Sequence, residues 1–138
     1  MKEPLITAEE FEKRLTALCL SGVTHNLPKK QRDRHILFRS VTQTLDPARQ
    51  YSEPELNAAL GRWLLQVGIG VDHVTLRRHL VDERYLVRDR QGSIYEVFLE
   101  GRGEAEFEPS VANIDSYALI DQARQQVAER KLQKLSQG

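Results

Sequence analysis

The sequence predicts a mostly α-helical protein with one small β-hairpin. Five stretches repeat apolar residues at helical spacing, and most of them begin and end at recognisable capping signals. Residues 85–99 instead hold two β-rich runs around a glycine-containing turn, which is typical of a hairpin. A chain of 138 residues is long enough for one domain that buries its core without a disulfide or a metal.

The first helix is predicted to begin after Thr7, which caps it with Glu10 as the partner of a capping box, and to stop at Ser21-Gly22. Cys19, near its end, is the one cysteine in the chain. A single thiol forms no internal disulfide, so it favours a reducing cytoplasm. We expect Cys19 to be buried and unreactive.

The second helix is predicted to run from Pro28, which suits a first-turn position, to about Leu45. Basic residues crowd its first two turns, although cations there oppose the helix dipole at a cost of a few tenths of a kcal/mol each. A phosphate partner explains this placement, and a solvated basic turn softened by Asp33 explains it equally well. The basic residues are Lys29, Lys30, Arg32 and Arg34.

The third helix repeats the start signal of the first, with Ser52 as N-cap and Glu55 three residues later, and Gly68 ends it. The fourth helix is predicted from its N-cap Asp72 to about Glu83. Its apolar residues can face inward, and its outer face then carries His73, Thr75, Arg77 and Arg78.

Three helices followed by a hairpin is the order of a winged helix-turn-helix, here with an additional helix at each end. In that arrangement the fourth helix lies in the major groove of DNA and the hairpin lies beside a phosphate backbone or the minor groove. Arginine suits both places, because its planar fork pairs with guanine or with phosphate. We therefore expect duplex DNA as partner, with His73, Thr75, Arg77 and Arg78 in the groove and Arg88, Arg90, Lys29 and Lys30 at phosphates.

The charge pattern permits this partner although 20 basic and 20 acidic residues give a net charge of zero. Residues 25–95 hold twelve basic and eight acidic side chains and all four histidines, whereas residues 1–24 and 96–138 are both net acidic. Chance fluctuation on a charge-rich surface explains this pattern as well. The sequence has no apolar run long enough to cross a bilayer and no signal-peptide pattern, so we expect a cytoplasmic protein without a membrane partner.

About half of the chain, residues 25–97, resembles a prokaryotic family known as domain of unknown function 2087. The resemblance implies a winged-helix-like fold, and some members of the family are joined to regulator-type DNA-binding domains. The sequence departs from the family's pattern in a longer connection at 65–71 and in Arg84, where a helix-ending glycine is common. The matching segments are Leu27-Pro28-Lys29-Lys30, Tyr51-Ser52-Glu53-Pro54-Glu55-Leu56-Asn57, Leu76-Arg77-Arg78-His79-Leu80-Val81-Asp82 and Leu86-Val87-Arg88-Asp89-Arg90-Gln91-Gly92-Ser93-Ile94-Tyr95.

The chain divides into three predicted parts. Residues 1–24 form a helix packed on the core, residues 25–99 form the winged-helix-like domain, and residues 100–138 form an acidic loop and a last helix. That helix, from about Asp115 to Leu135, carries a narrow apolar stripe. The stripe can pack within the chain or pair with a second copy in a homodimer.

The leading hypothesis is a small winged-helix DNA-binding protein, a transcriptional regulator rather than an enzyme. The alternative is a winged-helix protein–protein interaction module without DNA binding, which the neutral total charge and acidic flanks favour. The sequence contains no zinc-protease, paired Cys-x-x-Cys, serine-hydrolase, Walker or dinucleotide motif, so we expect no catalytic residues, no metal site and no cofactor.

Overall fold

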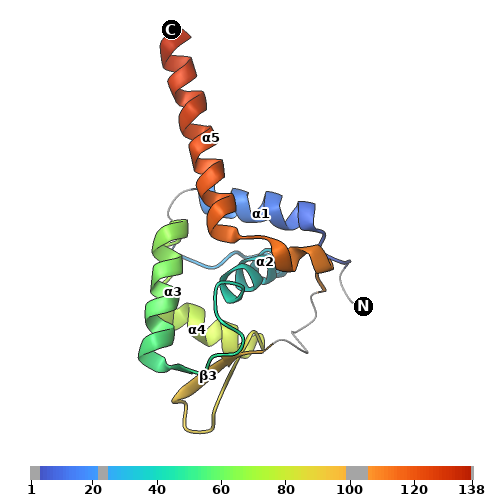
Figure 1. Cartoon of the computed structure of the whole chain (residues 1–138), viewed down its shortest axis with the longest axis vertical. Coiled ribbons are helices and arrows are strands. Elements are labelled where there is room, and N and C mark those ends of the chain that lie inside the picture. The colour runs from blue at the N-terminus through green and yellow to red at the C-terminus, as the bar shows by residue number, and fades with distance from the viewer. Residues whose placement is uncertain (1–3, 22–24, 99–105, 138) are drawn as a thin grey trace.

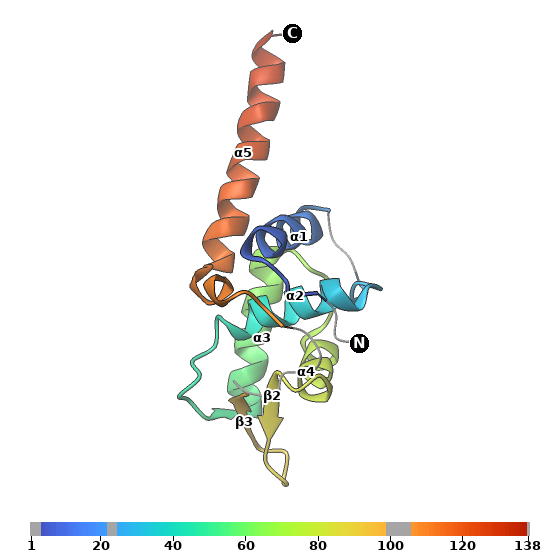
Figure 2. The same cartoon turned by 90° about the vertical axis from the view of Figure 1, so that its right-hand side faces the viewer.

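A computed structural model describes residues 4–21, 25–98 and 106–137. It confirms a mostly helical fold with a small antiparallel sheet, and Figures 1 and 2 show a packed body from which the last helix projects. The elements are α1 (Ala8–Leu20), α2 (Gln31–Thr42), β1 (Tyr51–Ser52), α3 (Glu53–Val67), α4 (His73–Asp82), β2 (Leu86–Arg88), β3 (Ile94–Val97), the 3₁₀ helix η1 (Pro109–Asn113) and α5 (Ser116–Gln137).

The sheet has three strands in the order β1-β3-β2, all antiparallel, with Tyr95 of β3 opposite Tyr51 on one side and Arg88 on the other. Strand β1 was not predicted, because Tyr51 and Ser52 were assigned only to the start of the third helix. An N-cap residue has extended backbone angles, and Ser52 uses them to pair with β3 as well. With β1 after α2 and the hairpin after α4, the topology is that of a winged helix-turn-helix.

Local capping signals set most helix ends. The Thr7 side chain accepts a hydrogen bond from the Glu10 backbone N–H at 3.1 Å, and Ser52 and Glu55 form a complete capping box. The start of α2 differs from the prediction by three residues, since the helix begins at Gln31 rather than Pro28. Its N-cap, Lys30, is extended, and no side chain caps this end.

One hydrophobic core joins the middle of the chain to both flanks. Phe11, Trp63, Leu76 and Leu80 are fully buried in it. The residues before α1 are held to a later segment by backbone hydrogen bonds, from Ile6 N–H to the Glu106 carbonyl at 2.9 Å and from Glu108 N–H to the Ile6 carbonyl at 2.8 Å. Residues of the N-terminal and C-terminal parts therefore pack together on the winged-helix middle.

Helix α5 touches the body only near its beginning. Ser116 and Ile120 are buried, whereas Leu132 and Leu135 are 65% and 79% exposed on the projecting end (Figure 2). Arg124 fastens the helix to the end of α3 by donating to the Gln66 carbonyl at 2.5 Å. Gly68 is needed there, because its φ is +77° and a Cβ atom would lie 2.8 Å from the Arg124 guanidinium.

The structure also shows the conformation of Arg84 and the burial of Cys19. Arg84, which replaces the glycine typical of the family, has φ of +63°, so the exit from α4 is strained as its position suggested. Cys19 is buried, and burial raises the pKa of its thiol to about 12. Among the described residues, no helix is both long enough and apolar enough to cross a membrane.

Candidate functional site

The orientation of α4 is fixed by its cap and by two core leucines. The carboxylate of Asp72 accepts hydrogen bonds from Thr75, from the backbone N–H at 2.8 Å and from the hydroxyl at 3.1 Å, and these bonds hold the pKa of Asp72 below its usual value. Leu76 and Leu80 are fully buried. Because a helix turns by about 100° per residue, Arg78 then points about 160° away from Leu80. Arg78 is accordingly exposed on the outer face of the helix.

Arg77 is placed differently from the prediction, which put it in a DNA groove. Its side chain is only 14% exposed, and it pairs with Glu53 at 3.2 Å. One of its nitrogens donates to the Asn57 side-chain oxygen at 2.5 Å, and its guanidinium lies 5.9 Å from the centre of the Tyr95 ring. Arg77 therefore ties α4 to α3 and β3, which leaves Arg78 as the exposed arginine of this pair.

The other two predicted residues of α4, His73 and Thr75, are less accessible than Arg78. His73 is half-buried. The Thr75 hydroxyl and backbone N–H are both bound by Asp72, so Thr75 belongs to the helix cap. At the other end of the helix, Asp82 is exposed one turn after Arg78. Glu83 is half-buried on the side of the helix that carries Thr75 and His79.

The hairpin turn presents its two predicted arginines to solvent. The Asp89 carboxylate accepts from the Ser93 backbone N–H at 2.8 Å, from the Ser93 hydroxyl at 3.0 Å and from the Ile94 N–H at 3.2 Å. These bonds, chiefly the two from backbone N–H groups, lower the pKa of Asp89 and close the turn. Arg88 and Arg90 are both exposed beside it.

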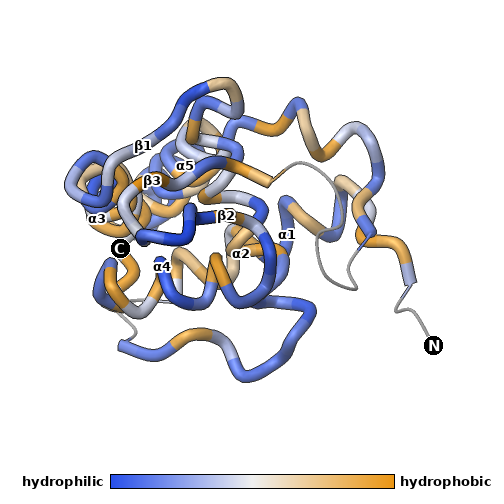
Figure 3. The backbone as a smooth tube through the Cα atoms, turned by 90° about the horizontal axis from the view of Figure 1, so that it is seen from below, coloured by the Kyte–Doolittle hydropathy of each residue, from blue (hydrophilic) through white to orange (hydrophobic). Residues whose placement is uncertain are grey.

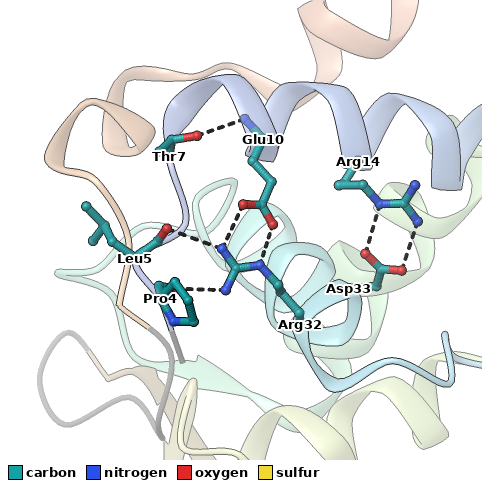
Figure 4. Close-up of polar contacts among 7 residues, drawn as sticks. All are labelled: Pro4, Leu5, Thr7, Glu10, Arg14, Arg32 and Asp33. Carbon is teal, nitrogen blue, oxygen red and sulfur yellow. Dashed lines mark hydrogen bonds and ion pairs between the residues drawn. The ribbon is translucent and has the colours of Figure 1, made fainter. Parts of the chain in front are cut away.

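The basic start of α2 is divided between internal and external roles. Arg32 binds the Glu10 carboxylate and also donates to the backbone carbonyls of Pro4 at 2.7 Å and Leu5 at 3.2 Å (Figure 4). The neighbouring residue, Asp33, receives two hydrogen bonds from Arg14 at 3.1 and 2.9 Å. These arginines therefore hold α1 against α2.

The two lysines just before α2 face outward instead. Lys29 and Lys30 are exposed, whereas Arg34 donates from one nitrogen to the carbonyls of Pro28 at 3.1 Å and Lys29 at 2.8 Å. Seen from the end of the body opposite α5, α4 lies between the hairpin and the segment that contains these lysines (Figure 3). Lys29, Lys30, Arg78, Arg88 and Arg90 are thus all exposed, on α4 and on the two segments that lie beside it.

The described residues offer little for other chemistry. No group of three His, Cys, Asp or Glu side chains in this part of the chain is arranged to hold a metal ion. Sequence reasoning missed the internal role of Arg77, although its spacing contains a signal. Arg77 lies about 60° around the helix from Leu80, at the edge of the buried face, while Arg78 lies on the far side.

The fold is mostly helical with a small three-stranded antiparallel sheet, and the exposed surface around α4 carries both basic and acidic residues. Residues 24–97 match the model of a family described as uncharacterized proteins conserved in bacteria (DUF2087), and the chain belongs to this family. No curated protein matches the chain, and no solved structure matches it.

Proposed function

We propose that this chain binds duplex DNA as a non-enzymatic, cytoplasmic transcriptional regulator, with α4 in the major groove and the hairpin against the phosphate backbone. The observation that carries the proposal is the exposure of Arg78 in the middle of α4. The hairpin and the segment before α2 lie on either side of this helix (Figure 3), and they carry the exposed cations Arg88, Arg90, Lys29 and Lys30. The major groove is about 12 Å wide and admits one α-helix, so a helix lying in it has a phosphate backbone on each side.

The proposed roles follow from side-chain chemistry. Arg78 is the residue that reads or clamps a base, because its guanidinium can donate two parallel hydrogen bonds to guanine. The exposed cations Arg88, Arg90, Lys29 and Lys30 contact phosphates, which position the protein without reading sequence. Arg77 supports α4 from behind through Asn57 and Glu53 and makes no base contact in this arrangement.

The test is fluorescence anisotropy with a pool of randomised duplexes, followed by selection of the bound fraction. Affinity should fall steeply with salt, with a slope of log K against log salt of about −4 for four or five phosphate contacts. Arg78→Ala should lower affinity for selected duplexes about tenfold and flatten their sequence preference. Arg130→Ala is the matched control, because Arg130 is exposed on α5, away from the candidate face. Duplex affinity that is unchanged in Arg78→Ala would contradict this placement of α4.

A protein–protein interaction module remains the second candidate, and the carboxylate of Asp82, one turn after Arg78, favours it. Asp82 is exposed near the end of α4 and repels phosphate. Asp82→Asn separates the two functions, because removing this charge should raise the affinity of a DNA-binding protein severalfold. A wild-type protein and an Asp82→Asn variant that both ignore duplex DNA at low salt would favour the interaction module.

We also propose that a second copy of the chain pairs along α5. The exposed Leu132 and Leu135 lie on one stripe of the projecting end together with Ala128, and a two-fold pairing brings the same apolar residues of both copies together. Winged-helix regulators that form dimers read two half-sites, which multiplies the contacts of one α4. Light scattering across a concentration series tests this, and a monomer at all concentrations would contradict it.

A further inference from the structure

A groove runs along the side of α4 that faces away from the hairpin. It has a volume of about 520 Å³ and lies between residues 25–29 and α4. Thr75, His79 and Glu83 line one wall at intervals of four residues, so their side chains follow one side of the helix. The opposite wall includes His25, Lys29 and Arg34.

The groove carries mostly groups that bind anions. Lys29 is exposed, and Arg34 is held at the wall by its bonds to the carbonyls of Pro28 and Lys29. His25 and His79 add two imidazoles, each of which has an N–H donor in either charge state. Among the described residues that line the groove, Glu83 contributes the one carboxylate. Two cations and two imidazole donors therefore face a single negative group, which disfavours a metal ion and favours an anion.

The position of the groove identifies the class of anion. The side of α4 opposite the groove faces the hairpin, where Arg77 meets Tyr95. A helix in the major groove has a phosphate backbone on each side. The hairpin arginines contact one of these backbones in the proposed arrangement, and Lys29 and Lys30 are its contacts to the other. The groove lies where phosphates of this second backbone would pass.

We propose that this groove is a phosphate-binding site, with Lys29, His25 and His79 as the ligand-binding side chains and Arg34 as a residue that positions the wall. The DNA backbone is one source of the phosphate, and that source rests on the proposed function. A free phosphate or a phosphorylated small molecule is the other source. Glu83 sets the end of the site, because a phosphate placed beside it would be repelled.

Nuclear magnetic resonance of the imidazole groups measures occupancy directly. Inorganic phosphate is titrated into one sample of the full chain, and a short duplex into another, while the signals of His25, His79 and His35 are followed. His35 is buried in the core, where its ring nitrogen Nδ1 lies 2.8 Å from the Tyr85 hydroxyl, so it is the internal control. We expect both probes to shift the signals of His25 and His79 and to leave His35 nearly unchanged.

Three variants separate this site from the proposed function. Lys29→Gln should lower duplex affinity about five- to tenfold near 0.1 M salt and reduce the salt slope by about one. His79→Ala should lower duplex affinity about threefold, since it removes one donor to a phosphate. The matched variant Arg130→Ala, on α5 and away from the groove, should keep the wild-type affinity.

The outcomes distinguish the two ideas. If inorganic phosphate shifts the two histidines while the duplex does not bind, the site stands, its ligand is a free phosphate and the proposed function fails. If Arg78→Ala weakens duplex binding, but neither probe shifts His25 or His79 and the affinity of His79→Ala equals that of Arg130→Ala, the phosphate site is wrong and the proposed function stands.

Discussion

The start of α2 and the turn of the hairpin both place basic residues at the ends of short elements, and they use them in opposite ways. At the start of α2, Arg32 is bound to Glu10 and to two backbone carbonyls. At the hairpin, Arg88 and Arg90 are exposed, and the one carboxylate of the turn, Asp89, is occupied by backbone N–H groups.

This difference shows that charge becomes available for a partner where the fold supplies no internal acceptor. Helix α1 brings the carboxylate of Glu10 to α2, so the arginine there stabilises the fold. The carboxylate nearest the hairpin arginines is turned inward to close the turn, so those arginines remain at the surface. We expect variants of the first region to change stability and variants of the second to change binding.

The largest loss of stability is expected for Arg32→Ala. It removes a two-pronged ion pair and two bonds to backbone carbonyls, and it leaves Glu10 partly buried without its partner. Hydrogen bonds to charged groups contribute about 1.5–3 kcal/mol, so the free energy of unfolding should fall by about 2–3 kcal/mol. Urea denaturation measures this, with Arg90→Ala as the exposed control. Equal denaturation midpoints for the two variants would remove the contrast between the regions.

A smaller loss of stability is expected for Arg77→Ala. This variant tests whether, of two neighbouring arginines, Arg77 stabilises the fold while Arg78 is exposed. The variant loses the bonds to Asn57 and Glu53 that join α4 to α3 and should lower the free energy of unfolding by about 1–2 kcal/mol. Arg78→Ala should change it by less than about 0.5 kcal/mol, because its side chain is exposed. Thermal unfolding of the two variants side by side is the measurement, and a reversed order would show that Arg77 is not the internal member of the pair.

Local signals in the sequence predicted the parts of the fold that depend on residues three or four positions apart. The caps at Thr7, Ser52 and Asp72 and the stop at Gly68 all belong to this class, and each is found. The capping box predicted at Thr7 is only half made, because the Glu10 carboxylate binds Arg32 instead. The repeated apolar spacing likewise predicted the inward face of α4.

Features that depend on distant residues were beyond such reasoning. Strand β1 exists because Tyr95 lies beside Tyr51, more than 40 positions earlier in the chain. Arg32 and Arg77 lie 22 and 20 positions from Glu10 and Asn57, so their internal roles depend on how helices pack. The helical spacing already separates Arg77 from Arg78, but the partners of Arg77, Asn57 and Glu53, could be identified only in the structure.

Lowering the pH should reduce the difference in the free energy of unfolding between the wild type and Arg32→Ala. The hydrogen bond from Arg32 lowers the pKa of Glu10 from its ordinary value of 4.5, so the ionised carboxylate stabilises the folded state at neutral pH. This contribution is fully present above about pH 5.5 and is lost as the pH falls through the lowered pKa. The variant lacks it, so the gap between the two stability curves should shrink below about pH 4.5 to the part that comes from the Arg32 bonds to the Pro4 and Leu5 carbonyls. Urea midpoints from pH 3 to 7 measure the gap, and a constant gap would show that Glu10 does not carry the interaction.

The smallest effect on stability is expected at the hairpin, and it tests the other half of the comparison. Replacing both arginines, Arg88→Gln with Arg90→Gln, removes two exposed charges from the surface, so the free energy of unfolding should change by less than about 0.5 kcal/mol. Duplex binding should respond, because each lost phosphate contact reduces the slope of log K against log salt by about 0.9. A slope reduced by about two with an unchanged unfolding curve places these charges at the partner. A changed unfolding curve with an unchanged slope would instead show that Arg88 and Arg90 stabilise the fold, as Arg32 does at the start of α2.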